Sequence, residues 1–195
     1  KGVILVSDAL ATSIATLAAA IIGAILHDCL SSSKESNRIK QEKIDILHSL
    51  RSELIAIQAL INARKDDILN NMNANLPEKT ESYSFIYLPI TYNYFTVYDG
   101  LATKLGMIDD KNLVNRIICS YADIKGLWEN VKDLEFIAKK GIDISISVEG
   151  TSIHKKAIST HYNYVDFIIH QQLPMVEKVI VDCISQIDKE LLKLK

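Results

Sequence analysis

Residues 9–26 read ALATSIATLAAAIIGAIL, an uncharged run that is rich in Ala, Ile and Leu. An α-helix rises about 1.5 Å per residue, so this run can cross a hydrocarbon core about 30 Å thick. Asp8 and His27 would then fall near the two interfaces of the bilayer. We therefore predict one transmembrane helix within residues 1–30, followed by a helical domain over residues 31–195.

Three other interpretations of the same run compete with the membrane helix. A cleaved signal peptide needs small residues before the cut, and the sequence His27-Asp28-Cys29 offers none. A lipid attached at Cys29 would also need a small residue before it, and Asp28 is not small. A helix buried in a soluble assembly fits an Ala-rich run, but a length of about 20 residues is unusual for one.

Basic residues follow the apolar run closely, whereas Lys1 alone precedes it; they are Lys34, Arg38, Lys40 and Lys43. Short segments rich in Lys and Arg stay on the cytoplasmic side of a membrane. The sequence therefore predicts that the C-terminal part of the chain is cytoplasmic.

Two rows of small or polar residues follow the predicted membrane helix with a spacing of four. The first row is Ala11, Ala15, Ala19 and Gly23, and the second is Asp8, Thr12 and Thr16. Small residues at this spacing let helices approach closely in lipid, and polar residues form hydrogen bonds between helices or line a pore. Ala-rich helices also produce such rows by chance. The rows favour a homo-oligomer that associates through this helix.

A polar break at residues 31–33 precedes the predicted cytoplasmic domain. A heptad-like seam follows, made of Leu47, Leu50, Leu54, Ile57, Ile61, Ile68 and Met72. Such a seam predicts a long helix that packs on another helix or on copies of itself. The Asn-rich residues 70–75 and then Pro77 should end this helix.

Two further helices are predicted in the middle of the chain. The first runs over residues 91–105 and ends at Gly106, and Asp109 or Asp110 caps the second. The apolar face of the second helix consists of Leu113, Ile117, Tyr121, Ile124, Trp128, Val131 and Leu134. Gly141 is expected to close that helix.

Residues 142–149 alternate apolar and polar side chains, which indicates a strand. Only residues 83–88 are a candidate partner, so a two-stranded ribbon and an ordered loop both stay open. From Thr151 to the C-terminus the pattern predicts a long amphipathic helix that Pro174 should kink. The fold class is all-α, an antiparallel bundle in which the first and last cytoplasmic helices pair.

The sequence holds no arrangement of a nucleophile with its base, no Gly-rich phosphate loop and no zinc spacing. Cys29, Cys119 and Cys183 are far apart and are predicted to be reduced structural cysteines, with Cys119 on a buried helix. His154 and His161 are interpreted as surface or interface histidines. We therefore expect no catalytic residues, no metal and no cofactor.

A small-nucleotide site is the ligand hypothesis that the sequence leaves open. Its candidate residues are Tyr92, Tyr94, Tyr98, Lys104, Lys111, Arg116 and Lys125. Aromatic rings stack on bases and cationic side chains neutralise phosphate. The preferred interpretation is that the rings are core packing and the cations a solvated face. The formal net charge of −2 argues against binding of long nucleic acid.

Residues 89–121 contain Tyr98-Asp99 and Lys104-Leu105-Gly106, followed by an amphipathic stretch that includes Tyr121. This pattern resembles a YD-x4-KLG motif of uncharacterised bacterial membrane-anchored proteins. The predicted layout is also similar to membrane effectors of phage defence, such as the cyclic-oligonucleotide-gated accessory proteins of type III CRISPR systems. The resemblance is one of layout and implies no site residue.

The sequence and this resemblance predict a non-enzymatic effector or sensor anchored in a bacterial inner membrane, with its C-terminal domain in the cytoplasm. Its expected partners are membrane lipid, copies of itself, a protein or a small nucleotide. The first alternative is a passive membrane-anchored scaffold that docks a soluble protein. The second is a soluble helical protein whose N-terminal helix is buried in an assembly.

Overall fold

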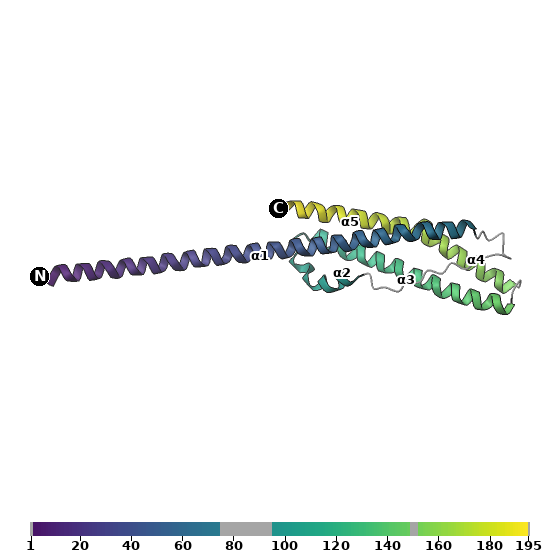
Figure 1. Cartoon of the computed structure of the whole chain (residues 1–195), viewed down its shortest axis with the longest axis horizontal. Helices are drawn as coiled ribbons and strands as arrows, with labels where there is room; N and C mark the ends of the chain where they lie inside the picture. Colours follow the sequence, from purple (N-terminus) through teal and green to yellow (C-terminus); the bar gives the residue numbers. More distant parts are fainter. Residues whose placement is uncertain (1, 75–94, 149–151, 195) are drawn as a thin grey trace. The chain divides into compact units, whose positions relative to one another are not determined.

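The computed structural model describes the backbone of residues 2–74, 95–148 and 152–194, and the side chains of residues 22–66, 95–140 and 152–194. The elements within these ranges are helical, which confirms the all-α class. They are α1 (Gly2–Ala74), α2 (Thr96–Leu101), the 3-10 helix η2 (Ala102–Met107), α3 (Lys111–Val148), α4 (Ser152–Phe167), the π-helix η3 (Ile168–Gln172) and α5 (Leu173–Lys193) (Figure 1). The chain divides into two compact units, Lys1–Asp45 and Ile46–Lys195.

The first unit is helical from Gly2 onward and belongs to α1. The predicted polar break at residues 31–33 is wrong, because α1 continues through these serines without interruption. Serine disfavours a helix only weakly, and neither Gly nor Pro stands there to stop it. The described part of α1 reaches Ala74, within the Asn-rich stretch that the sequence predicts as its end; Pro77 lies outside the described residues.

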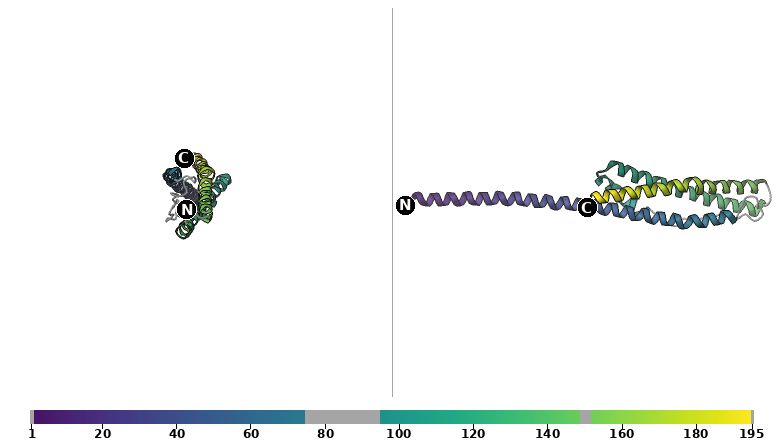
Figure 2. Two further views of the ribbon diagram at one scale, coloured as in Figure 1. Left: turned by 90° about the vertical axis from the view of Figure 1, so that its right-hand side faces the viewer. Right: turned by 90° about the horizontal axis from the view of Figure 1, so that it is seen from above.

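The second unit is an antiparallel bundle in which α1 pairs with α5. The side chains of Leu47, Leu50, Leu54, Ile57 and Ile61 are buried, which confirms this part of the seam. Ile68 and Met72 lie outside the described side chains. Arg51 pairs with Asp188 at 2.6 Å, and Lys65 pairs with Glu177 at 3.0 Å. The partners advance in opposite directions along the chain, so the two helices run antiparallel, as predicted (Figure 2).

The helix α3 supplies a second core face to the same unit. Most of its predicted apolar face is buried, namely Leu113, Ile117, Tyr121, Ile124, Val131 and Leu134, whereas Trp128 is only half-buried. Asp110 caps the helix, because its Oδ1 accepts the backbone N–H groups of Asn112 and Leu113 at 3.0 and 3.1 Å. This confirms the predicted cap.

The predicted strand at residues 142–149 and the predicted helix end at Gly141 are both wrong, because α3 continues to Val148. Extending an existing helix adds one hydrogen bond per residue, and an interior glycine costs only about 1 kcal/mol. A lone strand would have to begin without a partner. Residues 83–88, the proposed other strand of the ribbon, lie outside the described residues.

Two further helix boundaries differ from the predictions. Gly106 lies inside η2 and does not end a helix, since the turn continues to Met107. The long C-terminal helix contains the π-helix η3, which ends at Gln172, two residues before Pro174. Proline has no N–H and clashes with the carbonyl four residues earlier, so the expected disturbance takes the form of this wider turn.

Within the part of the chain that the structure describes, no helix is both long and apolar enough to cross a membrane. The side chains of residues 2–21, which make up most of the predicted membrane segment, lie outside the described residues.

Candidate functional site

The main buried polar feature of the second unit is the carboxylate of Glu53, on α1. Its Oε1 accepts the backbone N–H of Val97 at 2.8 Å, and its Oε2 accepts the N–H of Tyr98 at 2.9 Å. These N–H groups belong to the first turn of α2, where no side chain of α2 itself provides a cap. Glu53 therefore caps α2 from another helix and places negative charge at its N-terminus.

The hydroxyl of Tyr121, on α3, supplies the third donor to the same carboxylate. It donates to Oε2 of Glu53 at 2.8 Å, and the side chain of Tyr121 is fully buried. Burial, then the hydrogen bond and charge of Glu53, raise the pKa of Tyr121 well above its ordinary value of about 10. The phenol therefore stays protonated and acts as a donor that joins α3 to α1.

Aromatic rings surround this hydrogen-bonded centre. The rings of Tyr98 and Tyr121 stack with centroids 4.0 Å apart and planes 15° apart, and Phe95 meets Tyr121 edge to face at 6.2 Å. Lys125 Nζ lies 5.2 and 5.3 Å from the ring centroids of Phe95 and Tyr98. These contacts hold α2 against α3 through stacking and cation–π attraction.

Lys125 also closes the outer edge of this cluster, because its Nζ lies 2.8 Å from Oδ1 of Asp99. We call Glu53, Phe95, Tyr98, Tyr121 and Lys125 the Glu53 cluster. The carboxylate of Glu53, the hydroxyl of Tyr121 and the ammonium group of Lys125 each have a partner within the chain. Glu53 already accepts three hydrogen bonds, and Tyr121 keeps its proton. The role that this arrangement supports is therefore structural: it docks α2 onto α1 and α3.

The sequence analysis missed Glu53, the residue that organises this cluster. One signal was present: Glu53 lies three residues after Leu50 and four before Ile57, so it shares their helix face. A charged residue on an apolar seam indicates a buried partner. The identity of its donors was not readable, because two of them are backbone groups.

The predicted ligand-binding residues do not form one surface. Tyr98 and Lys125 meet in the Glu53 cluster, whereas Lys104 is exposed on η2. Lys125 follows Arg116 by nine residues on α3, which places the two on roughly opposite sides of the helix. Lys111 and Lys125 are separated by about 21 Å along α3. Tyr92 and Tyr94 lie outside the described residues.

Arg116 instead lines an open groove between α3 and α5, with a volume of about 570 Å³. The lining residues are Asn112, Asn115, Arg116, Cys119, Ser120 and Asp123 of α3 with Val179 and Gln186 of α5. Among the described residues, the guanidinium of Arg116 has no hydrogen bond or ion pair. The groove therefore offers one cation, that of Arg116, beside carboxamide groups and the carboxylate of Asp123.

The residues of the predicted membrane rows are placed only in part. The side chains of Ala11, Ala15, Ala19, Asp8, Thr12 and Thr16 lie outside the described residues. Gly23 is exposed, and a side chain added there would meet open space.

The structure corrects the prediction for Cys119 and decides between two alternatives for the histidines of α4. Cys119 is exposed, not buried, because it lies on the groove side of α3. His154 and His161 are buried on the core face of α4, which excludes the surface alternative and leaves the interface one. Within the described ranges, no group of three or more His, Cys, Asp or Glu residues is arranged to hold a metal ion.

No protein-family model, curated protein or solved structure matches this chain.

Proposed function

We propose that this chain is a non-enzymatic effector or sensor, anchored in a bacterial inner membrane, whose cytoplasmic helical bundle responds to a signal and whose membrane helices act as an oligomer. The observation that supports the anchor best is a set of apolar side chains at the end of the apolar run. Ile22, Ile25, Leu26 and Leu30 are each more than half exposed. Within a membrane, lipid and neighbouring membrane helices would together cover such side chains, and the basic residues from Lys34 onward suit the cytoplasmic side.

The Glu53 cluster supports a recognition domain in preference to a catalytic one. Its ionisable groups hold helices together, and this leaves neither a free base nor a nucleophile among them. A small nucleotide is the proposed signal, and its candidate groups are Tyr98 and Lys125, whose Nζ lies 5.3 Å from the Tyr98 ring centroid. Thermal shift with a panel of cyclic oligonucleotides tests this, and a shift lost in Lys125→Ala would support it.

Membrane fractionation of the full chain tests the anchor. The wild type should stay in the membrane pellet after an alkaline carbonate wash. A variant with Ala15→Lys and Ala19→Lys should be released, because each charge at the centre of a membrane helix costs about 3 kcal/mol. Recovery of the wild type in the soluble fraction without detergent would contradict the proposal.

Growth on induction, with and without phage infection, tests the effector role. An effector should arrest growth or limit infection, and the Ala15→Lys, Ala19→Lys variant should do neither. The matched control is Lys132→Ala, an exposed change on α3 that should leave the effect intact.

The second candidate, a passive scaffold, is supported by the groove that contains Arg116. Its occupant would be a soluble protein that presents a carboxylate. A scaffold predicts membrane recruitment of that partner, lost in Arg116→Ala, and no effect of the chain on growth. Growth arrest that persists in Arg116→Ala would favour the effector.

A further inference from the structure

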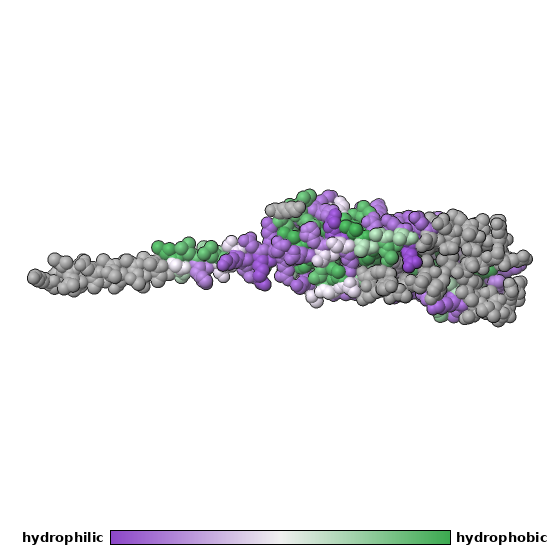
Figure 3. All heavy atoms as spheres, viewed as in Figure 1, coloured by the Kyte–Doolittle hydropathy of each residue, from purple (hydrophilic) through white to green (hydrophobic). Residues whose placement is uncertain are grey.

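One side of α1 within the first unit is apolar and uncovered. Ile22, Ile25, Leu26 and Leu30 are 57%, 57%, 56% and 62% exposed. Their spacing of three, one and four residues places them on one side of the helix. Figure 3 shows these apolar atoms at the start of the described side chains of α1. Most helical stability in proteins comes from packing such a face, so we expect another molecule or segment to pack against this side.

The charges of the same segment lie on the other side. Between residues 22 and 39 the charged residues and the histidine are His27, Asp28, Lys34, Glu35 and Arg38. At about 100° per residue they fall within about 120° of the helix circumference. Glu35 and Arg38 pair with each other at 2.6 Å, so they need no outside partner. The remaining side of the helix carries no charge.

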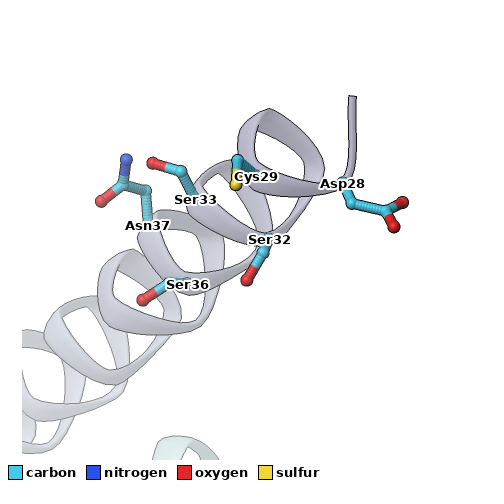
Figure 4. Close-up of a pocket in the computed structure, with 6 residues that line it drawn as sticks. All are labelled: Asp28, Cys29, Ser32, Ser33, Ser36 and Asn37. Atoms are coloured by element: carbon cyan, nitrogen blue, oxygen red, sulfur yellow. The ribbon is translucent and has the colours of Figure 1, made fainter. Parts of the chain in front are cut away.

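A shallow groove lies along this segment, lined by small residues and by Asp28 at its edge (Figure 4). The small residues are Cys29, Ser32, Ser33, Ser36 and Asn37. Their uncharged polar groups suit another polypeptide better than a lipid tail, because hydrocarbon leaves hydroxyl and amide groups unsatisfied. Small side chains also let a second helix approach closely. The occupant should therefore be a helix that is apolar near residue 22 and small and polar near residue 36.

We propose that residues 22–39 of α1 form a parallel, in-register coiled coil with the same segment of a second copy of this chain. This proposal names the segment that joins the copies in the oligomer of the proposed function. It rests on the proposed function only for the existence of that oligomer. Identical uncharged faces meet without like-charge repulsion, and the charged residues stay outside. Parallel pairing joins Ile22 to Ile22 and Ser36 to Ser36, whereas antiparallel pairing would bury Ile22 against polar side chains.

The heptad phase of the segment supports this pairing. Leu26 and Ser33 lie whole heptads before Leu47 and Leu54, whose side chains are buried. In the same phase Cys29 and Ser36 occupy the second seam position. Lys40 and Lys43 follow at the next two seam positions, where a like pair would repel. The interface should therefore end near Ile39.

Thiol cross-linking tests the register directly, because Cys29 is exposed and would face its copy across the seam. The full chain carries Cys119→Ser and is treated with a short bis-maleimide in mild detergent. Cys29 should give a covalent dimer, and so should a cysteine moved to Ser36 in a Cys29→Ser background. A cysteine moved to Ser31, on the charged side, should cross-link at least tenfold less. Equal yields at Ser31 and Cys29 would overturn the proposal.

The variant Leu26→Asp should reduce the Cys29 dimer at least tenfold, and Ser31→Asp should not. A wild-type chain that stays monomeric on sedimentation, or that cross-links only to a different protein, would also overturn the pairing. The test of pairing is independent of the test of the membrane anchor. A chain that pellets with membrane but does not cross-link refutes the pairing alone. A soluble chain that cross-links at Cys29 refutes the anchor alone.

Discussion

The helix α1 carries acidic residues in two contrasting settings. Glu35 is exposed and pairs with Arg38 one turn away on the same helix, at 2.6 Å. Glu53 is buried and accepts three hydrogen bonds from two other helices. Both groups are carboxylates, so the difference shows that burial and the number of hydrogen-bond donors decide how much a carboxylate contributes to stability. Water screens an exposed pair, so it contributes little to stability. Removal of a buried carboxylate leaves its hydrogen-bond donors unsatisfied, which is costly.

The largest expected effect comes from Glu53→Ala. The change leaves two backbone N–H groups of α2 and the Tyr121 hydroxyl without their acceptor, so the free energy of unfolding should fall by about 3–4 kcal/mol. Urea denaturation followed by circular dichroism measures it. Glu35→Ala is the matched control and should leave the free energy of unfolding unchanged within the error of the measurement, because water screens its exposed pair with Arg38. Equal losses in the two variants would remove the contrast.

A smaller loss is expected from Tyr121→Phe, which keeps the stacked ring and removes only the hydroxyl. Glu53 then retains its two backbone donors, so the free energy of unfolding should fall by about 1–1.5 kcal/mol. Tyr164→Phe provides the comparison, since that hydroxyl donates to Oδ1 of Asn130 at a longer 3.2 Å in a half-buried setting. A Tyr121→Phe variant as stable as the wild type would show that the buried bond contributes nothing net.

The raised pKa of Tyr121 also predicts a pH dependence at the alkaline end. Below about pH 10 the phenol is protonated in both the folded and unfolded chain. Above that value the unfolded chain loses this proton and the folded chain retains it, so stability falls by up to about 1.4 kcal/mol per pH unit. The advantage of the wild type over Tyr121→Phe should therefore shrink as the pH rises past about 10. A constant difference in urea midpoint across this range would contradict the shift.

The smallest expected effect is that of Lys125→Met. Methionine keeps most of the length of the side chain but loses the contact with Asp99 and the cation–π contacts with Phe95 and Tyr98. Because Lys125 and Asp99 are both about half exposed, we expect a loss of about 0.5–1 kcal/mol. Lys132→Met, an exposed change on α3, should have no measurable effect in the same assay. A loss as large as that of Glu53→Ala would show that Lys125, at the edge of the Glu53 cluster, contributes as much to stability as Glu53 at its centre.

The sequence predicted those features that depend on local pattern. The apolar spacing from Leu47 to Ile61 identified a buried seam, and the side chain of Asp110 identified a helix cap. Both depend on residues within one or two turns of each other. The antiparallel pairing of α1 with α5 also followed, because two long amphipathic helices joined through shorter ones can cover each other.

Features that depend on competition between structures were not predicted. Residues 142–148 alternate like a strand, yet they extend α3, because propagation of a helix needs no new partner. Cys119 and His161 show the same difficulty: one is exposed and the other buried, although both lie on amphipathic helices. Of the proposed ligand residues, Tyr98 and Lys125 were brought together by α2, whose docking depends on the unrecognised Glu53.

The π-helix η3 has a consequence for the rotation of α5. Buried residues of α4, η3 and α5 follow one another at His161, Val165, Ile169 and Leu173, three successive steps of four. In a regular α-helix each such step rotates the buried side by about 40°, so three steps would rotate it by about 120°. The wider turn of η3 absorbs one extra residue and cancels most of this drift.

The extra residue therefore sets the rotation of α5 about the helix axis relative to α4. Deleting a single residue from Ile168–Gln172 would restore α-helical turns and rotate α5 by about 100° relative to α4. The buried side chains of Val176, Ile180 and Cys183 would then turn out of the core. The length of this segment, counted in residues, is thus as constrained as the identity of any core side chain.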